Sequence, residues 1–184
     1  MEPIFTIQYG EFAVADYLSK KVKDSSVFIP ASAQEKGIDL LLYRHVNGCN
    51  TTNTIQVKMS RTYYNDKLDN GYPYYLWFNR YAVQRNANWY VLVGIYAKRP
   101  SEFETAKAKS TSWDTLMLAF TNKEMAKFMN EVKLKKDPDK DDKMFAFGFD
   151  DEKHIFQTRG CPADRDMSAF LIENRIDEIR NSFN

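Results

Sequence analysis

Two strand-like segments joined by an Asn-Gly turn constrain the fold of this chain more than any other feature. Residues 37–43 and 54–60 alternate side chains with the two-residue period of a β-strand. Asn47-Gly48 lies between them, and this dipeptide is the strongest short signal for a β-hairpin. A two-residue turn there fixes the pairing register, which places Asp39 directly opposite Gln56.

The polar residues of this hairpin share one face. Apolar side chains occupy alternate positions of the second segment, which leaves Gln56 and Lys58 together on the other face. The register adds Asp39 to the same face. An acid, an amide oxygen and an amine therefore gather on one small patch of sheet, as a metal-and-water site requires.

A helix expected over residues 7–22 carries a third candidate group. Its apolar stripe consists of Ile7, Val14, Ala15, Leu18 and Val22. Glu11 falls in the middle of this stripe, where an ionised carboxylate is unfavourable unless it is paired or bound to a metal. The alternative is that Glu11 lies in the first helical turn because the helix dipole favours an acid there.

The rest of the chain predicts a mixed α/β or α+β arrangement. Residues 61–77 look irregular and rich in Tyr, and residues 76–85 fit a short helix. The other expected elements are a short strand near Ser26–Pro30, strands over Trp89–Ala97 and Leu116–Phe120, a helix from the capping box Thr121–Glu124 to about Val132, a hairpin of Met144–Phe149 and His154–Thr158, and a final helix capped by Ser168. Without linkers or repeats, residues 1–184 are expected to form one domain.

Composition limits the function classes. The net charge is only +1, so any DNA-binding surface must be a local basic patch. Residues 1–9 lack the pattern of a signal peptide, and no apolar run is long enough to span a membrane, so the cytoplasm is the expected compartment. Cys49 and Cys161 have no spacing typical of a disulfide framework or a thiolate metal site.

Glu11, Asp39 and the Gln56-Val57-Lys58 tripeptide, in this order, resemble the motifs of the PD-(D/E)XK nuclease superfamily. They are closest to its homing-endonuclease group with Gln-x-Lys and to groups like the Holliday-junction resolvases. The resemblance implies a restriction-endonuclease-like fold, with a central mixed β-sheet flanked by helices. It also implies a metal-dependent DNA endonuclease that hydrolyses phosphodiester bonds with Mg²⁺ or Mn²⁺.

The resemblance also implies a role for each motif residue. Asp39 is the principal metal ligand, and Glu11 supports it directly or through water. Gln56 offers its amide oxygen, and Val57 its backbone carbonyl. Lys58 orients or deprotonates the attacking water, or steadies the phosphate.

Two positions depart from the superfamily pattern. Ile38 stands where Pro is common before the motif acid, which removes little chemistry. Gln56 replaces the usual acid of the third motif, so the site has fewer negative charges and a lower expected metal affinity. The missing negative charge favours a site that binds one metal ion rather than two. The alternative is a non-catalytic nucleic-acid- or protein-binding module, in which Asp39 and Lys58 form a structural ion pair beside Gln56.

Other residues suggest partners. Arg61, Arg80 and Arg85 are weak candidates for phosphate contacts. An aromatic cluster either packs a long loop, which is the commoner role, or stacks on bases; it consists of Tyr63, Tyr64, Tyr72, Tyr74, Tyr75 and Trp77. Folds of the kind that the resemblance implies often work as homodimers, since cutting both strands of DNA calls for two sites, so a homodimer or higher homo-oligomer is expected. Its interface could be the stripe of Ile172, Ile176, Ile179 and Phe183, although core packing explains these residues equally well.

Overall fold

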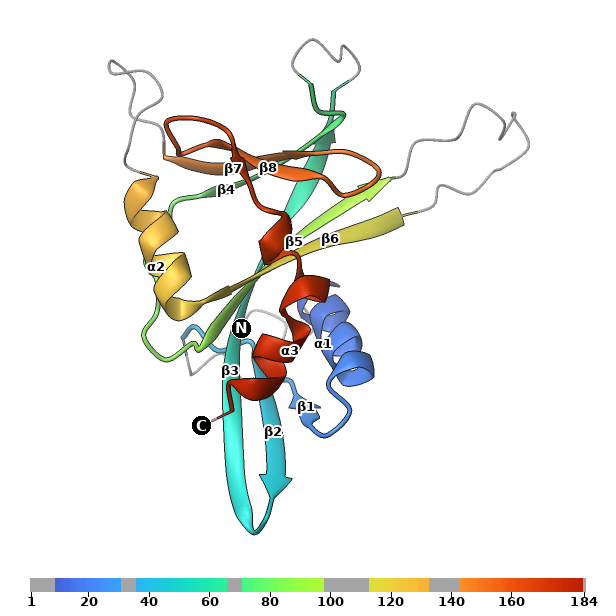
Figure 1. Cartoon of the computed structure of the whole chain (residues 1–184), viewed down its shortest axis with the longest axis vertical. Coiled ribbons are helices and arrows are strands. Elements are labelled where there is room, and N and C mark those ends of the chain that lie inside the picture. Colours follow the sequence, from blue (N-terminus) through green and yellow to red (C-terminus); the bar gives the residue numbers. More distant parts are fainter. Residues whose placement is uncertain (1–8, 31–35, 66–70, 98–112, 133–142, 184) are drawn as a thin grey trace, which may run out of the picture.

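A computed structural model of the chain describes residues 9–30, 36–65, 71–97, 113–132 and 143–183 (Figure 1). The elements in chain order are α1 (Tyr9–Lys21), β1 (Ser26–Phe28), β2 (Leu40–Val46), β3 (Cys49–Tyr64), β4 (Tyr74–Asn79), β5 (Trp89–Ala97), β6 (Trp113–Thr121), α2 (Asn122–Glu131), β7 (Met144–Phe149), β8 (Ile155–Arg159), β9 (Arg165–Asp166), the 3₁₀ helix η1 (Ser168–Phe170) and α3 (Ile172–Asn181). None of the described helices has the length and apolar character that crossing a membrane requires.

The expected hairpin forms β2 and β3, and its predicted register is confirmed. Asn47 and Gly48 have φ angles of 53° and 79°, the left-handed values that a tight hairpin turn of type I′ needs at both central positions. The ladder runs from Val46 opposite Cys49 to Leu40 opposite Ile55. The ladder ends at this pair: the amide of Asp39 donates to the carbonyl of Ile55, so the predicted pairing of Asp39 with Gln56 is not formed. The hairpin turn projects from the rest of the protein at the bottom of Figure 1.

The long strand β3 connects two parts of the sheet. In the first sheet, β3 lies between β2 and β5, with β1 next to β2 and β6 next to β5. In the second sheet, residues 62–64 of β3 pair with β4, and β7, β8 and β9 follow in order. The pairing of β3 with β5 is parallel, whereas all the other described strand pairs are antiparallel.

This architecture corrects the expected fold class. The restriction-endonuclease-like α/β (α+β) fold, with a central mixed sheet flanked by helices, is wrong. The described residues form a mostly antiparallel network of nine strands with three short α-helices. The second sheet is what the prediction lacked, because four of its five strands lie after the part of the chain that carries the motifs.

Residues 61–79 show why that sheet was missed. An irregular segment and a short helix were expected there, but β3 continues to Tyr64 and β4 covers Tyr74–Asn79. Tyr74, Leu76 and Phe78 alternate into the core, which is the period of a strand rather than of a helix. The capping box of α2 and the hairpin of β7 and β8 were predicted correctly. The parts of the predictions that cover residues 7–8, 98–112 and 133–142 lie outside the described residues.

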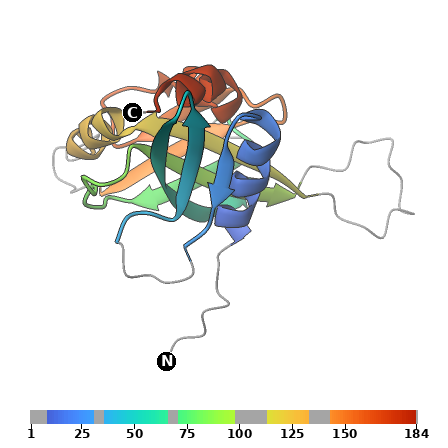
Figure 2. The ribbon, with the colours of Figure 1, turned by 90° about the horizontal axis from the view of Figure 1, so that it is seen from below.

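Two cores lie on opposite faces of the first sheet. One core fills the space between the first and second sheets, where aromatic side chains of β4, β5, β6 and β7 meet α2. The other is covered by α1 and α3, which pack Val14, Leu18, Ile172 and Ile179 onto β2, β3, β5 and β6. Figure 2 shows the same layers from below. Because Ile172 and Ile179 are buried in this core, core packing accounts for the α3 stripe; the homodimer stays a prediction.

Candidate functional site

Asp39 lies one residue before β2, at the point where the ladder with β3 ends. Its backbone amide donates to the carbonyl of Ile55 at 2.9 Å, and its Oδ2 accepts from the backbone amide of Val57 at 2.7 Å. The Asp39 carboxylate thus accepts the hydrogen bond that a backbone carbonyl would accept if β2 continued along β3. The other oxygen, Oδ1, has no hydrogen-bond partner in the described part of the chain, so it is available to a ligand.

Gln56 supplies a second available oxygen. The residue is only 6% exposed, and its Oε1 is buried without a hydrogen-bond partner among the described residues. An unsatisfied buried acceptor costs about 1–3 kcal/mol, so such an atom needs an explanation. The carbonyl of Val57 points to the same strand edge as its amide, beyond the last ladder pair of β2 and β3. Asp39, Gln56 and Val57 thereby offer three oxygen atoms near the end of the β2–β3 ladder.

The first turn of α1, on the face of β3 that Val57 occupies, brings Glu11 close enough to Asp39 and Lys58 for their charges to act on it. Gly10 lets the helix approach β3 closely, because a Cβ at Gly10 would lie 3.0 Å from the Cβ of Met59. Val14 and Leu18 continue the buried stripe, and Glu11 is half-buried on it, as the sequence predicted. Burial raises the pKa of the Glu11 carboxyl, the negative charge of Asp39 raises it further, and Lys58 opposes both effects.

Asp39 shows the same electrostatic pattern. Burial raises the pKa of its carboxyl above the ordinary value, although the amide of Val57 and the charge of Lys58 act in the opposite direction. Two carboxyl groups with raised pKa values therefore share one site. The charge of Lys58 lowers both pKa values but does not outweigh burial, and a bound cation would lower them further.

Lys58 lies on the same face of β3 as Gln56. Its Nζ lies 5.8 Å from the centre of the Tyr81 ring. Neither Asp39 nor Glu11 forms an ion pair with Lys58 in the described part of the chain, so the structural ion pair that the sequence allowed is not formed.

Two tyrosines near this site were missed in the sequence. Tyr81 follows β4, and its ring faces the ammonium of Lys58. Its hydroxyl contacts the sulfur of Met125 at 3.0 Å. Tyr90 on β5 pairs with Gln56, and its hydroxyl accepts from the amide of Gln84 at 2.6 Å. Burial raises the pKa of both phenols, so they stay protonated. No local pattern points to Tyr81, because its position depends on how β4 crosses the first sheet.

The three candidate arginines do not contact this site. Arg61 is exposed and donates from Nε to the hydroxyl of Tyr63 at 2.8 Å. Arg80 donates from Nε to the carbonyl of Met129 at 3.1 Å, in the last turn of α2. Arg85 is exposed in the turn before β5. Their proposed contacts with DNA stay predictions.

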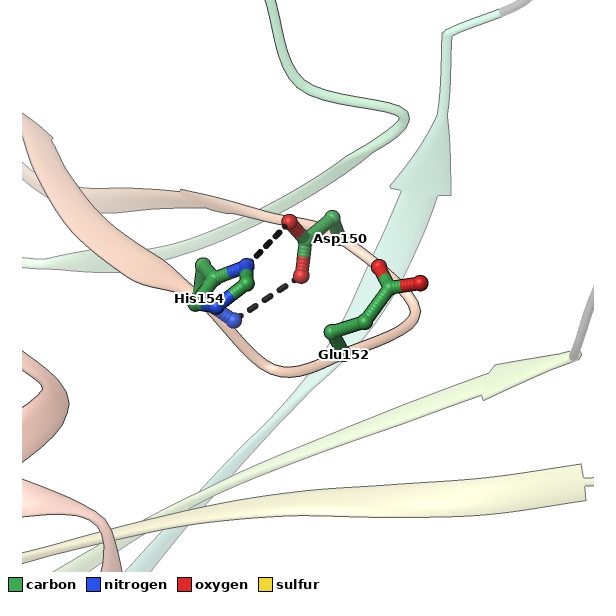
Figure 3. A group of neighbouring side chains, drawn as sticks. All are labelled: Asp150, Glu152 and His154. Carbon is green, nitrogen blue, oxygen red and sulfur yellow. Dashed lines mark hydrogen bonds and ion pairs between the residues drawn. The ribbon is translucent and has the colours of Figure 1, made fainter.

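A separate cluster of Asp150, Glu152 and His154 lies in the exposed turn between β7 and β8 (Figure 3). The two oxygens of Asp150 accept from the backbone amide and Nδ1 of His154, each at 2.8 Å. The hydrogen bond that the His154 ring donates to Asp150 and the negative charge of Asp150 raise the pKa of His154, although desolvation acts in the opposite direction. These contacts close the hairpin, and they are not an indication of magnesium binding.

Comparisons with known proteins identify no relative: no family model, curated protein or solved structure matches the chain. The function must therefore be argued from the geometry of the site.

Proposed function

We propose that this protein is a metal-dependent phosphodiester hydrolase that acts on DNA, with its site at Glu11, Asp39, Gln56 and Lys58. The observation that carries the proposal is the buried Oε1 of Gln56, which has no hydrogen-bond partner among the described residues. Gln56 stands between Ile55 and Val57, whose backbone groups hold Asp39. The order and types of the proposed site residues, which resemble the PD-(D/E)XK motifs, are the second support.

The donor atoms suit a hard divalent cation. Mg²⁺ and Mn²⁺ prefer oxygen ligands, commonly one or two carboxylates with water and substrate phosphate. Asp39 Oδ1, Gln56 Oε1 and the Val57 carbonyl would bind the ion, with Glu11 as a direct or water-mediated ligand. When bound, such an ion neutralises charge on the phosphate and activates a water molecule.

The protein residues have separate tasks in this proposal. The amide of Val57 holds Asp39 in place, so the ligand does not have to be reoriented for each turnover. The Lys58 ammonium binds a phosphate oxygen as negative charge develops there. Tyr81 lies against Lys58 and restricts where that ammonium can go.

A cleavage assay tests this proposal. Supercoiled plasmid, single-stranded oligonucleotides and a four-way DNA junction are incubated with Mg²⁺ or Mn²⁺. Asp39→Asn and Lys58→Ala should each reduce cleavage by about 100-fold to 10,000-fold, the range for groups that act directly in a reaction. Asp16→Asn and Lys20→Ala are matched controls, because these residues form an exposed ion pair on α1 and should leave cleavage unchanged.

Mn²⁺ binding provides a second measurement that needs no substrate. Calorimetry should show binding to the wild type and to Asp16→Asn, and none to Asp39→Asn. If Mn²⁺ binds all three equally, or binds none of them, the metal site is wrong. If Mn²⁺ binds as expected but no DNA substrate is cleaved, the hydrolase loses its support in favour of a binding module.

A further inference from the structure

The outer face of the second sheet carries a row of aromatic side chains. Tyr75 and Trp77 alternate with the buried residues of β4, and Tyr63 lies beside them at the end of β3. The described helices pack elsewhere, since α1 and α3 cover the first sheet and α2 lies beside β5 and β6. Figure 1 shows β4, β7 and β8 on the side away from α1 and α3.

This face is hollowed by a groove, which we call the β4–β7 groove. Its volume is about 540 Å³, and its lining includes Tyr72, Tyr75, Trp77, Thr158, Arg159 and Asp164. Ala146 and Gly148 are the small residues of β7 on this face. A Cβ at Gly148 would lie 2.5 Å from the ring of Tyr72, so the ring rests directly on the strand backbone.

The aromatic rings are held in fixed orientations. Trp77 stacks on Tyr63 with ring centres 4.2 Å apart and an angle of 17° between the planes. Tyr72 meets Tyr75 edge to face, with ring centres 6.3 Å apart and an angle of 86°. All four side chains are half-buried. Tyr63 is covered by Trp77 on one face and by Arg61 on the other, so Tyr72, Tyr75 and Trp77 are the rings that line the groove. Rings fixed in this way lose little conformational entropy when a flat ligand stacks on them.

Positive charge lies at two places beside these rings. Arg159 lines the groove, and the guanidinium of Arg61 lies 4.9 Å from the centre of the Tyr63 ring. Asp164 brings one negative charge into the lining. Supported aromatic rings with flanking arginines are the combination that binds unpaired bases and their phosphates, because every base has a flat face to stack.

We propose that the β4–β7 groove binds unpaired nucleotides of a single nucleic-acid strand by base stacking. This site goes beyond the proposed hydrolase centre, to which none of the groove residues belongs. It requires neither a metal ion nor cleavage. The two proposals can therefore fail independently.

The test measures binding of a fluorescein-labelled dT₁₂ oligonucleotide by anisotropy, in EDTA and at low salt. Tyr75→Ala should weaken binding about tenfold, the effect of losing one stacked base. Trp77→Phe keeps an aromatic ring stacked on Tyr63, so it should weaken dT₁₂ binding less than Tyr75→Ala does. Arg159→Gln should weaken binding and reduce its dependence on salt. Trp113→Ala removes an exposed aromatic residue of β6 that does not line the groove, and it should leave binding unchanged.

Thermal unfolding of each variant separates lost binding from lost folding. The proposal is overturned if dT₁₂ does not bind the wild type, or if folded Tyr75→Ala and Arg159→Gln bind it as the wild type does. Binding of a β-glucan oligosaccharide in place of dT₁₂ would also overturn it, because aromatic grooves can bind sugars. Binding of dT₁₂ without cleavage of any DNA would support the groove while removing the support for the hydrolase.

Discussion

Two clusters of charged residues in this protein differ in whether their charged side chains pair with one another. At the C-terminal helix, Arg175 is buried and donates to Glu124 at 2.9 and 3.1 Å and to Glu178 at 3.0 Å. At the start of β2, Glu11 and Asp39 share a half-buried site with Lys58, but neither forms an ion pair with it in the described part of the chain. We call these the Arg175 cluster and the Asp39 cluster.

The pKa directions separate the two clusters. Burial alone would raise the pKa of Glu124, but the hydrogen bonds from Arg175 and Thr121 outweigh it and lower the pKa. In the Asp39 cluster burial prevails, and the pKa values of both carboxyls are raised. Charged groups that serve the fold bring their own partners, whereas groups that serve a ligand are left incompletely satisfied. The predictions below test this contrast, from the largest expected effect to the smallest.

Arg175→Met should destabilise the protein by about 3 kcal/mol, the low end for breaking a buried ion pair, because Glu124 is partly exposed. The free energy of unfolding in urea measures this. Arg180→Met is the control: its ion pair with Asp177 is exposed, so the loss should stay under about 1 kcal/mol. Equal losses would show that the Arg175 cluster has no special structural role.

Divalent cations should stabilise the wild type through the Asp39 cluster. At an Mn²⁺ concentration 100 times Kd, the gain in unfolding free energy is about 2.7 kcal/mol. Asp39→Asn should remove this gain, whereas Glu124→Gln should keep it despite a lower starting stability. Unfolding in Mn²⁺ and in EDTA is compared for each variant. A gain that persists in Asp39→Asn would place the cation elsewhere.

Without metal, Asp39→Asn should make the protein more stable at pH 7. The change removes a charge that burial disfavours, and the amide oxygen can still accept from Val57. We expect about 0.5–1 kcal/mol, within the usual range for relieving a strained functional site. Asp16→Asn, on the exposed face of α1, should show no such gain in thermal unfolding. A destabilised Asp39→Asn would mean that the ionised carboxylate serves the fold.

The smallest effect is an opposite pH dependence of the two clusters. Folding raises the pKa values of Glu11 and Asp39. Their contribution to the free energy of unfolding is therefore complete below the ordinary carboxyl pKa, and it is lost as pH rises through the raised pKa values. The pKa of Glu124 is lowered, so its contribution is present above the ordinary carboxyl value and disappears as pH falls through the lowered one.

Metal-free unfolding between pH 3 and 7 measures both trends on the same protein. Asp39→Asn should reduce the fall in unfolding free energy that the wild type shows as pH rises. Glu124→Gln should reduce the fall that the wild type shows as pH becomes acidic. Variants with identical pH profiles would contradict the contrast between the clusters.

The sequence predicted the local parts of the candidate site well. Asn47-Gly48 has positive φ at both positions, and this turn sets the register of β2 and β3 as far as Leu40 opposite Ile55. The register brings Asp39 to the backbone of Ile55 and Val57. The position of Glu11 on a buried stripe follows from the helical period in the same way. Both are features of short segments, where the spacing of side chains determines what lies together.

The second sheet could not be predicted in this way. Its strand β4 pairs with β7, about 70 residues later in the chain, and such pairing leaves little trace in a local pattern. Tyr81 and the β4–β7 groove depend on that pairing, so they were missed or left open. The aromatic residues 63–77 were correctly seen as a cluster, but which of them face the core and which face outward follows from the register of β4.

Strand β3 takes part in both sheets, and this has a consequence for how the protein opens. Residues 55–61 hydrogen-bond to β5, and residues 62–64 hydrogen-bond to β4, so neither sheet can separate without disturbing the same strand. The backbone amides of β3 that donate to β5 and β4 should therefore exchange with deuterium only when the whole protein unfolds. Gln56 and Lys58 thus sit on the most slowly exchanging segment, and their geometry persists through the local fluctuations that loosen the edges of the sheet.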